Sequence, residues 1–160
     1  MGVVEMSDKQ FISMAIHLSR ENMESGGGPF GALIVRDTQI IARAGNTVTT
    51  SNDPTAHAEV NAIRQAARYL NDFNLSGCVL YSSCEPCPMC LGAIYWARID
   101  RICFAAGKED ARYAGFDDSF IYDELGKSID QRKIPTTQLL REEAFRVLEE
   151  WKQKENKTDY

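Results

Sequence analysis

The sequence predicts an α/β sandwich, and three features of it lead to that class. Apolar residues recur at helical spacing in several windows, short apolar runs typical of strands lie between them, and Gly, Pro and Asp clusters separate the two patterns. Strands that alternate with helices are typical of helices packed on the faces of one sheet. With 160 residues, 44% of them hydrophobic, we expect a single domain over residues 1–160.

The first expected helix opens with a capping box. Ser7 and Gln10 have the Ser-x-x-Gln spacing in which each side chain bonds the other residue's backbone N–H. The apolar residues that follow share one helical face: Phe11, Met14, Ala15 and Leu18. Gly26–Pro29 ends this helix, and two strands joined by a short turn are expected over residues 30–35 and 40–44.

The rest of the chain continues the alternation. In order, we expect a polar loop over 46–54, a helix over 56–70, a strand over 78–82, a helix over 88–97, a strand over 102–106 and a closing helix over 142–154.

Charge and targeting signals restrict the class of partner. The formal net charge is −5 and the pI about 5.1. No stretch is dense in Lys or Arg, so we expect a small-molecule substrate rather than a nucleic acid. No apolar run reaches the roughly 20 residues of a membrane span. Residues 1–7 lack the basic start and apolar core of a signal peptide, and we expect the protein in the cytoplasm.

The cysteines suggest a metal site. There are five, an odd number, and three of them fall within residues 84–90. Cys87 and Cys90 are three apart, so on a first helical turn their sulfurs point the same way. Pro88 suits the first helical position, which makes Cys87 the expected N-cap. The positive end of the helix dipole favours the thiolate that zinc binds.

His57 and Glu59 complete the pattern. His57 is expected near the start of the preceding helix, where its imidazole can join the two thiolates as a third ligand. Three protein ligands leave a fourth position for water, which is typical of catalytic zinc. Residues two apart on a helix point about 200° apart, so Glu59 is not a second ligand of the same kind. Its carboxylate is instead suited to carry protons to and from that water.

The same residues also have non-catalytic interpretations. The cysteine pair alone is compatible with a redox motif or a structural zinc knuckle, but neither needs a His-x-Glu about thirty residues upstream. Cys84 is expected on the loop after a strand, packed as a small apolar group. Cys78 and Cys103 fall in apolar strand-like runs and are expected in the core. His17 lies off the apolar helical face and is expected at the surface.

His-x-Glu followed by Pro-Cys-x-x-Cys is the general sequence signature of zinc deaminases. On His57, Glu59, Cys87 and Cys90 the chain resembles the cytidine-deaminase superfamily. The resemblance implies one Zn²⁺ per chain and a three-layer α/β/α sandwich with a mixed central sheet of about five strands.

Longer segments resemble one branch of that superfamily, the guanine deaminases. They are residues 28–32, Asn46, residues 49–60, residues 83–97 and residues 114–120. The last segment lies outside the shared zinc core and is the most telling. The resemblance implies hydrolysis of guanine to xanthine and ammonia. Within the superfamily, the alternatives are guanosine, cytosine, amino-triazine and tRNA adenosine deaminases; outside enzymes, the alternative is a zinc-bearing interaction module.

Several residues are candidates for binding a purine. Asn46 can both donate and accept at the purine edge. Asp118 matches the acidic pocket residue of the family and is assigned to catalysis and binding, while a helix N-cap is its alternative. Phe30 offers an apolar face to the ring or packs in the core.

The chain end is the last candidate. In proteins that this chain resembles, the final segment covers the pocket, so Tyr160 is expected to bind substrate, with a frayed tail as the alternative. The reach of residues 141–160 favours a homodimer with exchanged C-terminal segments, although a tail acting within its own chain stays open.

Overall fold

The computed structural model describes residues 5–160. Met1–Val4, part of the segment on which the expectation of no signal peptide rested, lie outside the described residues. The chain divides into a first compact unit that ends at Asp118 and a second unit over Ser119–Tyr160. Each unit is described by itself.

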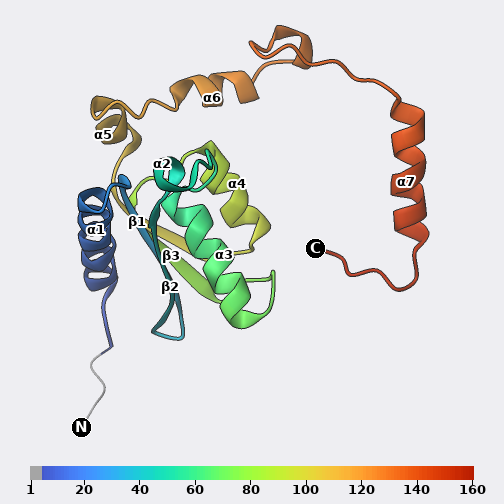
Figure 1. The fold of residues 1–160 in the computed structure, drawn as a ribbon. Helices are drawn as coiled ribbons and strands as arrows, with labels where there is room; N and C mark the ends of the chain where they lie inside the picture. Colours follow the sequence, from blue (N-terminus) through green and yellow to red (C-terminus); the bar gives the residue numbers. More distant parts are fainter. Residues whose placement is uncertain (1–4) are drawn as a thin grey trace. The chain divides into compact units, whose positions relative to one another are not determined.

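A mixed sheet forms the centre of the first unit. Its strands are β1 (Gly28–Arg36), β2 (Gln39–Asn46), β3 (Cys78–Cys84) and β4 (Arg101–Ala106), in the order β2-β1-β3-β4 (Figure 1). β1 pairs antiparallel with both β2 and β3, and β3 pairs parallel with β4. The parallel pair needs a crossover, and the chain between β3 and β4 supplies it as a helix.

Helices cover both faces of this sheet. α1 (Asp8–Glu24) lies on one face, and α3 (Ala58–Leu70) and α4 (Pro88–Trp96) lie on the other (Figure 1). The larger core lies on the α3 side, and its small residues let the helices approach the sheet closely. These layers confirm the three-layer sandwich that the resemblance implied.

Side chains of α1 and of the sheet are linked at one edge. Phe11 packs 4.9 Å from the ring of Tyr81, measured between centroids. The hydroxyl of Tyr81 donates to Asp8 at 2.6 Å, and Arg101 binds the same carboxylate at 2.8 Å. These contacts lower the pKa of Asp8 to about 2, first through Arg101 and then through Tyr81.

The expected elements are present, with additions. Strands and helices agree with the structure to within a few residues, and the capping box at Ser7 is formed. The polar loop contains a short helix, α2 (Val48–Ser51), and α5 (Lys108–Tyr113) follows β4. α2 has only four residues and shows no apolar periodicity, so it could not be predicted from the sequence pattern.

The sheet has four strands among the described residues, where about five were expected. The chain turns into α5 directly after β4, and residues 119–160 form helices and irregular segments only. No described segment therefore pairs with the outer edge of β4.

The second unit contains α6 (Ser119–Leu125), the 3₁₀ turn η1 (Ile129–Gln131) and α7 (Arg141–Gln153). None of its residues is buried. No helix in the described part of the chain is both long and apolar enough to cross a membrane.

Candidate metal centre and active site

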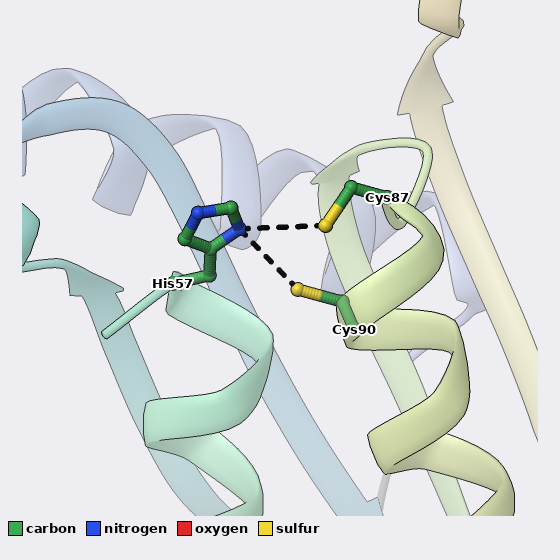
Figure 2. A group of neighbouring side chains, drawn as sticks. All are labelled: His57, Cys87 and Cys90. Carbon is green, nitrogen blue, oxygen red and sulfur yellow. Dashed lines mark hydrogen bonds between the residues drawn. The ribbon is translucent and has the colours of Figure 1, made fainter. Parts of the chain in front are cut away.

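Three candidate metal ligands meet at the N-termini of two helices. The Nδ1 atom of His57 lies 3.6 Å from Cys87 Sγ and 3.5 Å from Cys90 Sγ (Figure 2). One ligand atom from each of the three residues lies within 4.8 Å of the others. The structure thus brings together the three residues that the sequence predicted as ligands.

The helix starts account for this placement. His57 is the N-cap residue of α3, and Cys87 is the N-cap residue of α4, with Pro88 directly after it. Both have extended backbone angles that direct the side chain across the helix end. Cys90 lies in the first turn of α4 and is buried. The expected N-cap position of Cys87 is therefore confirmed.

The spacing of these atoms fits a tetrahedral zinc ion. With Zn–N near 2.0 Å and Zn–S near 2.3 Å, a tetrahedral site separates nitrogen from sulfur by about 3.5 Å. Hydrogen bonding from Cys90 is the main cause that lowers the pKa of Cys87 to about 4, and the same contact raises the pKa of Cys90. A divalent cation bound by both sulfurs would favour the thiolate form of each.

Glu59 lies buried beside these ligands in the first turn of α3. One carboxylate oxygen accepts from the Ser82 hydroxyl at 3.3 Å, and the other lies 3.5 Å from Cys90 Sγ. Burial is the largest cause that raises the pKa of Glu59. A buried carboxyl group with a raised pKa at a metal-ligand cluster is typical of proton-transfer sites.

The residues predicted to bind substrate lie in different parts of the chain. Asn46 is the last residue of β2 and is buried. Burial and then the charge of Cys87 raise the pKa of Asp118, so its carboxyl group is within electrostatic reach of the metal ligands. Tyr160 belongs to the second unit, and its predicted role stays a prediction.

Phe30 has a clear packing partner. Its ring meets Phe116 edge-on, with centroids 4.9 Å apart and planes at 80°. The two rings help to line an apolar cavity of about 380 Å³, which Ser83 and Cys84 also line.

The remaining cysteines and His17 can also be placed. Cys78 is fully buried as expected, and Cys103 is half-buried and packs on the α1 side of the sheet. Cys84 is buried, which confirms its packing, but it ends β3 rather than lying on the loop, because its backbone still pairs with Ala106. His17 is exposed and lies 3.2 Å from Glu21.

Three site residues escaped the sequence analysis. Ser82 binds Glu59 from the middle of an apolar strand, where no motif marks it. Phe116 lies in the segment that matched the family, but no role was assigned to it. Asn61 lies one helical turn after His57, a spacing that would have suggested a shared function.

The fold and the site together define a class. Two thiolates and one imidazole offer zinc three protein ligands, and a buried carboxyl group lies next to them. This arrangement defines the zinc enzymes that activate water for attack on a substrate.

Comparison with known proteins assigns the chain within that class. Residues 5–106 match the model of the cytidine and deoxycytidylate deaminase zinc-binding region. The chain therefore belongs to the cytidine and deoxycytidylate deaminase family.

Individual relatives narrow the branch. The chain is 52% identical to a guanine deaminase of Bacillus subtilis, and the match covers 97% of this chain and 100% of that protein. The solved structure of the Bacillus subtilis guanine deaminase superposes with a TM-score of 0.94 and covers 97% of this chain and 99% of that chain. A guanine deaminase structure from Nitrosomonas europaea is 30% identical, with a TM-score of 0.67 over 94% of this chain and 86% of that chain. A tRNA-specific adenosine deaminase of Aquifex aeolicus is 43% identical over 63% of this chain and 67% of that protein.

Proposed function

We propose that the protein hydrolyses guanine to xanthine and ammonia. The observation that carries the proposal is the extent of the match to the Bacillus subtilis guanine deaminase, which spans both units. The tRNA adenosine deaminase of Aquifex aeolicus matches about two thirds of the chain. The net charge of −5 also favours a small base over a nucleic acid. We place this activity in the cytoplasm.

His57, Cys87 and Cys90 would hold one zinc ion, whose Lewis acidity makes water a nucleophile at neutral pH. Glu59 accepts the proton that water loses as its oxygen attacks C2 of guanine. The same carboxyl group then delivers that proton to the exocyclic amine. The bond between C2 and the amine breaks, so the amine leaves as ammonia and the purine becomes xanthine. Its burial supports this role, because a raised pKa brings a carboxyl group closer to the operating pH.

Three residues would hold the purine. Asn46 would bind its edge through the side-chain amide. Asp118, whose pKa is raised by burial, would bind a ring nitrogen or the leaving amine through its carboxyl group. Phe30 would provide an apolar surface beside the ring, and its side chain lines an apolar cavity.

We also propose a homodimer that exchanges its C-terminal segments, residues 141–160. This segment has no buried residue of its own, although α7 carries Phe145 and Leu148 on one face. The first unit in turn leaves Tyr95 of α4 largely exposed and Phe104 of β4 half exposed. A second copy would let each segment bury its apolar side chains and bring Tyr160 to the partner's pocket. A dissociated, fully active monomer at assay concentration would refute the exchange.

The direct test is ammonia release from a panel of substrates: guanine, guanosine, cytosine, an amino-triazine, and adenosine in a tRNA stem-loop. We expect guanine to be converted far faster than the others. Faster conversion of another member would overturn the substrate while leaving the zinc chemistry in place. A protein that contains zinc yet deaminates none of them would instead be a zinc-bearing interaction module.

A further inference from the structure

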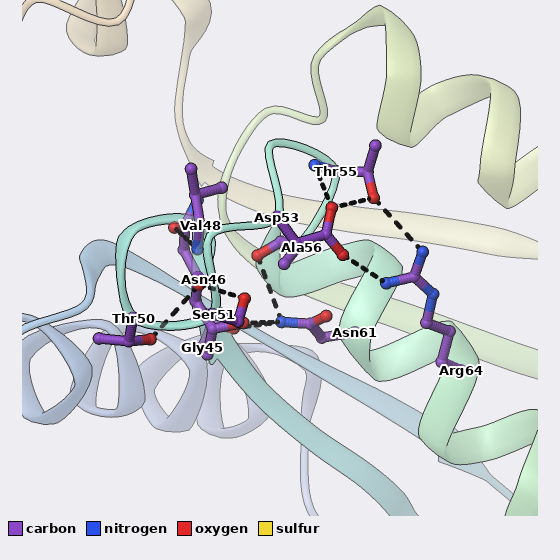
Figure 3. Close-up of polar contacts among 11 residues, drawn as sticks. Gly45, Asn46, Val48, Thr50, Ser51, Asp53, Thr55, Ala56, Asn61 and Arg64 are labelled. Atoms are coloured by element: carbon purple, nitrogen blue, oxygen red, sulfur yellow. Dashed lines mark hydrogen bonds and ion pairs between the residues drawn. The ribbon is translucent and has the colours of Figure 1, made fainter.

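Helix α3 holds the end of β2 through one asparagine. Nδ2 of Asn61 lies 3.0 Å from the carbonyl oxygen of Gly45, 3.0 Å from Thr47 Oγ1 and 3.2 Å from the carbonyl oxygen of Ala56 (Figure 3). One side-chain amide thus binds the strand end and both ends of the loop that follows it. Because one amide nitrogen contacts all three acceptors, it couples the position of the strand end to the positions of both loop ends.

Helix α1 holds the same strand end from the other side. Nδ2 of Asn22 donates to the carbonyl oxygens of Gly28 at 2.7 Å and Asn46 at 2.8 Å. A Cβ atom on Gly27 or Gly45 would overlap this amide, so both positions need glycine for Asn22 to enter. The strand end is therefore bound by a side chain from each of the two helical layers.

The loop over residues 47–56 connects the candidate substrate-binding residue to the candidate metal ligand. The Thr47 N–H donates to the Ala56 carbonyl at 2.9 Å, which closes residues 47–56 into a loop. Asn46 directly precedes this closure and His57 directly follows it. The backbone of Asn61 also donates to the His57 carbonyl at 2.9 Å. The candidate substrate residue and the candidate metal ligand are thus tied to each other through one short hydrogen-bonded framework.

The same framework fixes the orientation of the Asn46 amide. Its Oδ1 accepts the backbone N–H of Val48 at 3.2 Å, and a backbone N–H can bind only the oxygen side of an amide. Gly28 leaves room for this side chain, since a Cβ there would lie 2.9 Å from Oδ1. Within the described residues, Nδ2 of Asn46 makes no hydrogen bond, so its donors remain for a ligand.

We propose that Asn61 and Asn22 are positioning residues that set the Asn46 donors relative to His57 and thereby determine how tightly a purine base is held. Neither residue touches the substrate; both act through the backbone on which Asn46 lies. The proposal rests on the proposed function, because it takes guanine as the base that Asn46 binds.

The test compares three leucine variants in the zinc-loaded full-length protein. Asn61→Leu and Asn22→Leu remove the side-chain hydrogen bonds that hold the end of β2. Gln65→Leu is the matched control, because Gln65 lies one turn further along α3 and accepts the Arg43 backbone N–H of the same strand at 3.3 Å. In the Asn61 and Asn22 variants we expect KM for guanine and the inhibition constant of the product xanthine to rise about tenfold. Gln65→Leu should stay within about threefold of the parent in both quantities.

Two further measurements separate positioning from general loss of structure. Zinc content should remain at the parental ratio in all variants, and the pH profile of kcat should be unchanged. The Asn46 side-chain amide signal in a ¹⁵N correlation spectrum, assigned through Asn46→Asp, should shift in the Asn61 and Asn22 variants but not in the control. Should Asn61→Leu fail to fold, Asn61→Ser, which keeps one donor, should show the same changes at smaller size.

The outcomes are distinguishable. Variants with a lowered melting temperature but parental KM, xanthine inhibition and Asn46 signal would show a purely structural role and overturn the proposal. Zinc loss that accompanies the rise in KM would also overturn it, because Asn61 would then act through His57 alone. An unsubstituted protein that does not deaminate guanine would refute the proposed function, and the Asn46 signal would still decide the positioning role.

Discussion

The two units of the chain show similar helical patterns but bury very different amounts of them. In the first unit, apolar residues of α1 and α3 meet the sheet, and Ala62 and Leu80 are fully buried. In the second unit, Phe145 and Leu148 recur at helical spacing along α7, yet no residue is buried. Amphipathic periodicity therefore predicts a helix, whereas the surface that covers its apolar face depends on tertiary or quaternary packing.

The comparison assigns the chemistry to the first unit and, by our proposal, only closure of the pocket to the second. Substitutions at the metal centre should remove activity or metal, while changes in the second unit should affect turnover with the metal in place.

Cys87→Ala should abolish turnover and zinc binding, because it removes one of three ligands at the centre. Cys84→Ala is the matched control: this thiol is buried, lies close in sequence and contacts the Gly107 carbonyl instead of the ligand group. Metal analysis of both purified variants is the measurement. Loss of zinc from the Cys84 variant and its retention in the Cys87 variant would reverse the ligand assignment.

Glu59→Gln should keep zinc and the fold but lower kcat for guanine by about 10²–10⁴-fold, since it removes a proton carrier and leaves the ligands in place. Ser82 can still donate to the amide oxygen, so the side chain should keep its position. Steady-state kinetics with zinc content measured on the same sample tests this. Turnover within about threefold of the parent would refute the role.

Deletion of Asp159 and Tyr160 should lower kcat/KM for guanine by about tenfold, while zinc content and melting temperature barely change. The expectation follows from the exposed position of Tyr160, which contributes nothing buried to its own unit. Parallel kinetics and thermal unfolding of the truncated and full-length proteins provide the test. Unchanged kcat and KM would show that the chain end is dispensable.

Asp8→Asn should have the smallest effect, a loss of a few degrees in melting temperature near neutral pH. The pKa of Asp8 is lowered from 3.8 to about 2, so its ionised form stabilises the folded state above pH 3.8, and this contribution is lost as the pH falls toward 2. The difference in melting temperature between parent and variant should therefore be constant near neutral pH and shrink as the pH falls from about 4 to about 2. A difference independent of pH would exclude the Arg101 and Tyr81 contacts as its origin.

Much of the first unit could be predicted from local patterns. Pro88 and the two cysteines define a helix start, and the His-x-Glu spacing defines the other half of the metal centre; both depend on residues close in sequence. The contacts of the Asn61 amide could not be predicted in this way, because its acceptors are two backbone carbonyls and the Thr47 hydroxyl, which only the fold brings together. Asparagine also has many ordinary uses in loops and helix ends.

The strand count failed for a related reason. A fifth strand would have to pair with one of the edge strands, β2 or β4, and pairing between distant segments leaves little trace in either sequence alone. Residues 132–140 lack the alternation of a half-buried strand, and in the structure they form no strand. The position of Tyr160 relative to the pocket likewise depends on packing rather than on any local pattern.

The outer edge of β4 has a consequence for how the protein is produced. Within residues 5–160, β4 pairs with β3 alone, and Phe104 on this strand is half exposed. An unpaired strand edge can pair with any extended segment that reaches it. Newly made chains at high concentration can therefore aggregate through this edge before the correct partner surface covers it. We expect insoluble material when synthesis is rapid, and a higher soluble yield when slower synthesis gives each chain time to meet the correct partner surface.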